Sequence, residues 1–153
     1  MGLTLNGALT LSGNNTYTGG TTINGGSTLT LGAGGTAGSV AGAIADNGVL
    51  AINHSDNFVL NNVSGTGQLQ QTGPGITWLG SGLSYTGGTR ISAGTLIVND
   101  PAALGSGGLT ISGGELLEGL SGTINNQLTM SNIFTIAAAH GQTLTTRRRI
   151  LGR

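Results

Sequence analysis

Apolar residues alternate with small polar residues along most of this chain, so that every second position in each short run is hydrophobic. A period of two is typical of β-strands, because successive side chains in a strand point to opposite faces. The best helical candidate, residues 37–45, contains Gly38 and Gly42, which weaken it. We therefore predict an all-β protein whose strands contain the apolar pairs Leu3/Leu5, Leu9/Leu11, Leu29/Leu31, Leu50/Ile52, Ile76/Trp78, Leu96/Val98, Leu109/Ile111, Leu128/Met130 and Phe134/Ile136.

One stretch of the chain occurs twice. Residues 9–32 read LTLSGNNTYTGGTTINGGSTLTLG, and residues 79–98 read LGSGLSYTGGTRISAGTLIV, with Tyr17 of the first copy aligned on Tyr85 of the second. Self-similarity at a fixed distance indicates a stacked repeat fold, in which each unit buries its apolar surface against its neighbours. A meander or sandwich would not require the same motif again at this distance.

A parallel β-helix satisfies both the alternation and the repeat. If three coils separate the two copies, each coil takes roughly 23 residues, and the chain forms about six coils, a rod roughly 30 Å long at the usual strand spacing. We expect Leu, Ile and Val to point into the lumen, Thr and Ser to cover the faces, and Gly to form the turns between strands.

Composition supports a folded, uncharged rod. Gly, Thr, Asn and Ser make up 78 of the 153 residues, while five basic and five acidic residues cancel, and neither Cys nor Lys is present. The lack of Cys excludes disulfides and thiolate sites. A surface with so few charged residues offers no basic patch that would bind nucleic acid. No window is apolar enough for a membrane span, and the N-terminus lacks the features of a signal peptide. Because the motif is repeated, we favour the interpretation that the chain is a piece of a longer protein over the alternative that it is an intracellular protein.

The last residues depart from the pattern. We expect residues 1–142 to form the β-helix segment and residues 143–153 to be an aberrant basic tail. Four of the five arginines lie there, namely Arg147, Arg148, Arg149 and Arg153. A truncated or shifted reading frame explains the tail, and a short cationic cap is the alternative.

Specific residues of the repeat carry a family resemblance. Residues 15–23 read NTYTGGTTI and are followed by Gly25, Gly26 and Thr-Leu-Thr-Leu at 28–31; residues 84–91 read SYTGGTRI, with Arg90 where the first copy has Thr. These motifs resemble the autotransporter-associated β-strand repeat of passenger domains in type V-secreted proteins of Gram-negative bacteria.

That resemblance implies a right-handed, single-stranded parallel β-helix outside the outer membrane, as part of an adhesin or similar surface protein. It also implies a signal peptide, further coils and a C-terminal translocator barrel, which we do not expect within these residues. The repeat is a structural unit, so the resemblance brings no catalytic positions.

Candidate chemistry is sparse. His54 and Asp56 lie two apart in the polar stretch 53–57, and His140 precedes a glycine, so both histidines are interpreted as turn residues. Glu115 and Glu118 are the only close carboxylate pair, but a spacing of three places them on opposite faces of a strand. We predict no catalytic, cofactor-binding or metal-binding residues.

The aromatic residues raise the question of glycan binding. Trp78, Tyr17 and Tyr85 have rings that stack on sugars in other proteins. The two tyrosines are motif positions, and we expect them to serve coil packing, whereas Trp78 fits the lumen or the surface equally well.

The sequence therefore predicts a non-enzymatic structural stalk or interaction segment of a secreted or surface-displayed, adhesin-like autotransporter passenger. Its partners would be a host-surface or glycan ligand and further coils of the parent chain. The alternatives are a glycan-processing enzyme on a β-helix scaffold, or a truncated gene remnant without function. An enzyme would need a long loop or neighbouring coils with clustered Asp, Lys or Arg, and the body of the chain offers only Arg90 and no Lys.

Overall fold

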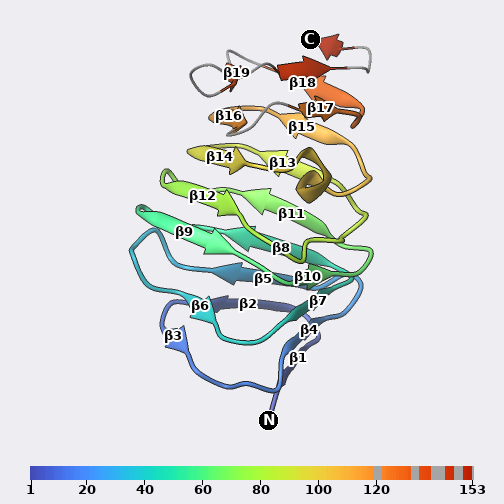
Figure 1. Ribbon diagram of the computed structural model, residues 1–153. Helices are drawn as coiled ribbons and strands as arrows, with labels where there is room; N and C mark the ends of the chain where they lie inside the picture. Colours follow the sequence, from blue (N-terminus) through green and yellow to red (C-terminus); the bar gives the residue numbers. More distant parts are fainter. Residues whose placement is uncertain (119–121, 132–134, 139–143, 147–149, 153) are drawn as a thin grey trace.

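The computed structural model is a solenoid of short parallel strands, and it describes residues 1–118, 122–131, 135–138, 144–146 and 150–152. Each coil crosses three faces in turn, and strands of successive coils pair in parallel on each face. Figure 1 shows the coils stacked from the N-terminus at one end to the C-terminus at the other. The predicted all-β parallel β-helix is confirmed.

The first face begins with the four-stranded sheet β1 (Leu3–Leu5), β4 (Thr21–Ile23), β7 (Ile44–Asp46) and β10 (Val63–Ser64). A single bridge from Val63 to Leu83 continues it. The short 3-10 helix η1 (Pro101–Leu104) takes this position in the next coil, and the pair β17 (Gly122–Ile124) and β20 (Leu144–Thr146) follows in the coils after that.

The second face is one continuous eight-stranded sheet. It contains, in spatial order, β2 (Ala8–Leu11), β5 (Thr28–Leu31), β8 (Val49–Ile52), β11 (Gln68–Gln71), β13 (Thr89–Ile91), β15 (Leu109–Ile111), β18 (Leu128–Met130) and β21 (Ile150–Gly152). Six steps lead from β2 to β18, which agrees with the expected stack of about six coils, and a seventh step leads to β21.

The third face is divided. Its first part is the pair β3 (Asn14–Asn15) and β6 (Ser39–Val40). Its second part is the five-stranded sheet β9 (Asn57–Leu60), β12 (Ile76–Leu79), β14 (Thr95–Val98), β16 (Glu115–Glu118) and β19 (Thr135–Ala138). β6 and β9 belong to successive coils, yet they lie in different sheets.

Ladders of aliphatic side chains fill the lumen. On the second face the register aligns Leu9, Leu29, Leu50 and Leu69, and all but the partly buried Leu9 are fully buried. Since burying one such side chain contributes about 1.5–3 kcal/mol, and each is covered only by its neighbours in the stack, the coils stabilise one another.

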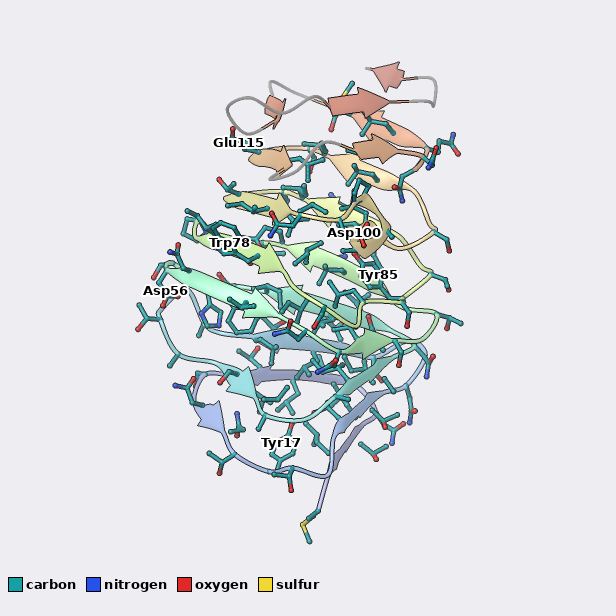
Figure 2. The ribbon with its side chains drawn as sticks, viewed as in Figure 1. Tyr17, Asp56, Trp78, Tyr85, Asp100 and Glu115 are labelled. Carbon is teal, nitrogen blue, oxygen red and sulfur yellow. The ribbon has the colours of Figure 1, made fainter. Side chains whose placement is uncertain are left out.

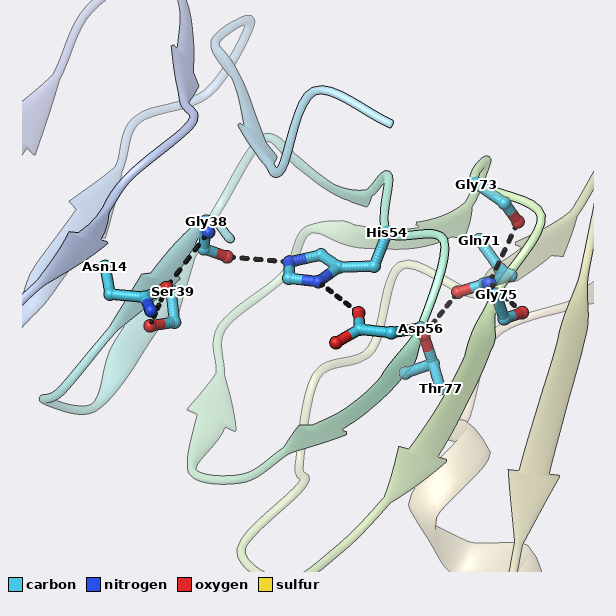
Figure 3. A network of polar contacts seen from close by, with 9 residues as sticks. All are labelled: Asn14, Gly38, Ser39, His54, Asp56, Gln71, Gly73, Gly75 and Thr77. Carbon is cyan, nitrogen blue, oxygen red and sulfur yellow. Dashed lines mark hydrogen bonds and ion pairs between the residues drawn. The ribbon is translucent and has the colours of Figure 1, made fainter. Parts of the chain in front are cut away.

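Some polar side chains also lie in the lumen, where other groups of the chain form hydrogen bonds with them. Gln71 lies in the lumen, where its Nε2 donates to the carbonyls of Gly73 and Gly75 at 3.2 Å each, while Thr77 Oγ1 donates to its Oε1 at 2.6 Å (Figure 3). Buried groups satisfied in this way cost little stability.

The coils are shorter than the repeat offset suggests. Along the second face, Leu50 pairs with Leu69 and Leu69 with Thr89, so that one coil takes about 20 residues. The offset from Tyr17 to Tyr85 is therefore three coils plus about one face. As a result, β4 of the first repeat copy lies in the first face, whereas β13, its counterpart in the second copy, lies in the second face. The expectation of three whole coils between the copies is wrong.

The division at residue 142 stays a prediction. Strands β20 and β21 pair in register with β17 and β18, so the stacking pattern extends to residue 152 within the described residues. His140 and the arginines at 147–149 and 153 lie outside those residues. Among the helices that the structure describes, none is long and apolar enough to cross a membrane.

Candidate functional site

His54 is buried, with only 3 % of its surface exposed, and it ties two coils together. Its Nε2 lies 2.9 Å from the carbonyl oxygen of Gly38, and its Nδ1 lies 3.1 Å from Asp56 Oδ1 (Figure 3). Its ring also packs on Phe58, with ring centroids 4.4 Å apart. The interpretation of His54 as a solvated turn residue is therefore wrong, because the loop that contains Gly32 and Gly38 of the preceding coil lies against its ring.

Both ring nitrogens of His54 are thus occupied by neighbouring groups of the chain. A catalytic base needs a ring nitrogen within reach of its substrate, and a metal ligand needs one free for the ion. Across the described part of the chain, no group of three or more His, Asp or Glu side chains gathers where a metal ion would fit. The arrangement is suited to fastening the loop that contains Gly38.

The carboxylate pair lies in one strand, β16. The register places Glu115 beside Thr95 and Glu118 beside Val98. The expectation that their spacing of three places them on opposite faces of the strand stays a prediction. Glu115 is partly exposed on the third face, and the side chain of Glu118 lies outside what the structure describes.

The tyrosines serve packing, as expected. Tyr85 is buried, and its hydroxyl lies 2.7 Å from Thr89 Oγ1, which donates to the carbonyl oxygen of Leu104 at 3.0 Å. Burial raises the pKa of Tyr85 well above its ordinary value. Tyr17 makes the same 2.7 Å contact with Thr21 Oγ1.

Trp78 lies at the surface, on the outward side of the third face. Figure 2 shows it on the same side of the stack as Asp56 and Glu115. In β12 the buried positions are Thr77 and Leu79, so the apolar pair Ile76/Trp78 predicted from the alternation is the outward pair. The residue as a whole is 38 % exposed.

Trp78 is the centre of an apolar column. The register places Val59 of β9 on one side of it and Ile97 of β14 on the other. Val59 is 59 % exposed, and Ile97 is nearly covered, at 6 %. We call Val59, Trp78 and Ile97 the outward column. Glu115 and Glu118 are the only charged residues in the five strands of this sheet, so the column stands on a face poor in charge.

Sequence reasoning missed Val59 and Ile97. The signal was present, because Phe58-Val59-Leu60 and Leu96-Ile97-Val98 are runs of three apolar residues inside strands. Alternation lets either the middle residue or the two flanking residues enter the lumen, so each run had to place at least one apolar side chain outside.

Comparisons with known proteins agree with this architecture. The family model of the passenger-associated-transport-repeat matches residues 6–31 and 69–98, which include most of both repeat copies. An uncharacterized protein of Escherichia coli, YuaQ, is 30 % identical over 107 residues, covering 67 % of this chain and 8 % of its own length. The adhesin BmaC autotransporter of Brucella suis is 40 % identical over 70 residues, covering 46 % of this chain and 2 % of its own length.

The chain therefore spans less than a tenth of these two relatives. No solved structure matches it significantly. The two matched repeats, the homologous autotransporter and the stacked parallel coils together show that the chain is a passenger segment built from autotransporter passenger repeats.

Proposed function

We propose that this chain is a non-enzymatic stalk and contact segment of an adhesin-like autotransporter passenger, displayed on the bacterial surface or secreted. The relatives support this proposal because one of them is named an adhesin and both are far longer than the chain.

The outward column is the surface that we expect to contact a ligand. A half-exposed Trp flanked by aliphatic side chains on a flat sheet is suited to stack on the apolar face of a sugar ring or to pack on a host-surface protein. Of the large hydrophobic side chains that the structure describes, only Val59 and Trp78 of this column and Met1 at the chain start are strongly exposed.

The ligand test uses Trp78 as its own reporter. It is the sole Trp of the chain, so its fluorescence reports directly on the column. Titration with a panel of host-type glycans and with extracellular-matrix proteins should shift or quench this fluorescence saturably for at least one ligand. Trp78→Ala should remove that binding, and Tyr17→Phe should keep it. Binding that survives Trp78→Ala would place the contact elsewhere.

A separate experiment tests the proposal that the chain is not an enzyme. Incubation of the chain with acidic and neutral polysaccharides should release no new reducing ends and no unsaturated products. Their appearance in proportion to protein concentration, and their loss in Glu115→Gln, would instead support a glycan-processing enzyme.

A further inference from the structure

Three Asn-Gly dipeptides lie at equivalent positions in successive coils. Each one directly follows the last residue of a strand on the first face, and the register pairs the last residues of β1, β4 and β7 with one another. Figure 1 shows these three strands stacked next to one another. The chain has no other Asn-Gly pairs, and we call these the amide corner: Asn6-Gly7, Asn24-Gly25 and Asn47-Gly48.

An Asn-Gly pair loses ammonia in water without an enzyme. The backbone nitrogen of the glycine gives up its proton and attacks Cγ of the Asn side chain, which closes a succinimide ring while Nδ2 leaves as ammonia. Water then opens the ring at either carbonyl, and the product is Asp or isoAsp. Glycine favours the ring closure because it has no Cβ in the way, and Asn is for this reason a thermolabile residue.

Hydrogen bonds protect two of the three glycine nitrogens. Gly7 N donates to Ser27 Oγ at 2.9 Å, and Gly48 N donates to Asp46 Oδ1 at 3.0 Å. Each nitrogen must give up this bond before it can lose its proton and turn toward the Asn side chain. A hydrogen bond of ordinary strength therefore slows the reaction about fivefold.

The third nitrogen, that of Gly25, is unprotected. It donates to no group among the residues that the structure describes, and Gly25 is exposed to water. It lies in a turn that Ser27 N closes by donating to the carbonyl oxygen of Asn24 at 3.0 Å. The space around it is open, since a Cβ at Gly25 would meet only the carbonyl oxygen of Asn47, at 3.7 Å.

We propose that Asn24 is a site of spontaneous deamidation, and that its conversion loosens the contact between two coils. Asn24 Nδ2 donates to Asn6 Oδ1 of the preceding coil at 2.7 Å. An ionised Asp or isoAsp at position 24 has no donor, so two acceptor oxygens would face each other. IsoAsp also lengthens the backbone between β4 and β5, the strands that pair with β1 and β2. The inference is independent of the adhesin role.

The experiment follows the three sites in the unmodified chain. The chain is incubated at neutral pH and body temperature, and mass spectrometry of its peptic peptides measures the conversion of each Asn. Asn24 should convert about fivefold faster than Asn6 and Asn47. In urea, where the hydrogen bonds of the fold are lost, this preference should disappear.

Three results of this experiment would overturn the proposal. The first is equal or faster conversion of Asn6 or Asn47 in the folded chain. The second is the same preference for Asn24 in urea, which would make it a property of the local sequence. The third is an Asn24 that stays intact in the folded chain over a period in which the unfolded chain converts.

Two variants test the protection of the glycine nitrogens. Ser27→Ala frees Gly7 N, so the conversion of Asn6 should become about fivefold faster. Gly25→Ala fits the turn but adds a Cβ beside the attacking nitrogen, so Asn24 should stay intact over the period in which the parent converts. An unchanged rate at Asn6 in the first variant, or at Asn24 in the second, would overturn the mechanism.

A matched pair of charge variants tests the loosening. Thr28 N donates to the carbonyl oxygen of Gly7 at 3.0 Å, so the hydrogen exchange of this amide reports on the contact between the two coils. Asn24→Asp removes the donor, and the Thr28 amide should exchange about fivefold faster than in the parent. Asn6→Asp adds the same charge but keeps an acceptor for Asn24 Nδ2, so exchange should stay at the parent rate. Equal exchange in the two variants would overturn the loosening.

Discussion

Tyr85 and Thr89 form a hydrogen-bonded pair inside the lumen, with 2.7 Å between the Tyr85 hydroxyl and Thr89 Oγ1. Tyr17 and Thr21 form the same pair at 2.7 Å in the first repeat copy. Thr21 belongs to β4 on the first face, and Thr89 belongs to β13 on the second. The motif therefore builds one local structure on either face, which indicates that the faces of the coil are interchangeable for it.

Removing the Tyr85 hydroxyl should destabilise the chain more than removing that of Tyr17. Tyr85→Phe leaves the buried Thr89 without one of its partners, which should cost about 1–2 kcal/mol of unfolding free energy. Tyr17 is only partly buried, so water replaces its hydroxyl and the cost should be less than about 0.5 kcal/mol. Urea denaturation of the two variants checks this, and equal costs would contradict it.

Asp46 should make the chain less stable at neutral pH than at acidic pH. It is fully buried, its Oδ2 has no hydrogen-bond partner, and burial raises its pKa from 3.8 to about 6, although hydrogen bonds from the Gly48 and Leu50 backbones lower it. Because the folded-state pKa is raised, the contribution of Asp46 is greatest below about pH 4. It is lost as the pH rises to about 6, and it amounts to roughly 3 kcal/mol.

The variant Asp46→Asn removes this dependence. It should stabilise the chain at pH 8 by up to about 3 kcal/mol and should have little effect at pH 3.5. Chemical denaturation of parent and variant at both pH values measures the difference. A variant that is less stable than the parent at pH 8 would show that the ionised carboxylate is favourable.

The loop before β6 should be sensitive at Gly38 and tolerant at Gly35. Gly38 has φ +123°, and a Cβ there would meet the backbone of Gly32 and Leu11, whereas a Cβ at Gly35 would meet nothing within 4 Å. Gly38→Ala should therefore cost about 2 kcal/mol or more, and Gly35→Ala should be neutral or stabilising by up to about 1 kcal/mol. Thermal unfolding followed by circular dichroism compares the two, and similar melting temperatures would contradict this account.

The His54 contacts should hold the same loop in place. His54→Ala removes the hydrogen bond to the Gly38 carbonyl oxygen and the packing on Phe58, which should cost about 1–3 kcal/mol. It should also increase proteolytic cleavage within residues 33–42 under native conditions. Asp56→Asn keeps the Gly38 contact and serves as the control, so equal cleavage in both variants would contradict the role of His54.

Much of the fold could be predicted from the sequence, because period-two alternation and a repeated motif are direct consequences of stacked strands. The positions of Leu29, Leu31, Leu50 and Ile52 in the lumen follow from their spacing alone. The coil length could not be predicted from the offset between the two motif copies, because that offset does not contain a whole number of coils. The alternation also indicated the wrong inward residues in β12. The residue that enters the lumen between Ile76 and Trp78 is Thr77, whose hydroxyl donates a hydrogen bond to Gln71.

The candidate site was less predictable. His54 is buried by a loop from the preceding coil, and no local pattern reports such a contact. β6 pairs with β3 and not with β9, and the Asn14 side chain accepts two hydrogen bonds where β3 and β6 meet. Neither feature produces a periodic pattern in the sequence, so each can be recognised only when the positions of the coils in space are known.

Cysteine cross-linking between neighbouring coils tests the coil register most directly. The chain has no native Cys, and the register places Gln70 of β11 directly beside Arg90 of β13, with both side chains on the outside. Paired positions on adjacent strands have the spacing that a disulfide requires. The double variant Gln70→Cys/Arg90→Cys should form an intramolecular disulfide rapidly under mild oxidation, and Gln68→Cys/Arg90→Cys should form it much more slowly. Faster cross-linking of positions 68 and 90, or none in either pair, would contradict the parallel solenoid in which β11 and β13 are neighbours in this register.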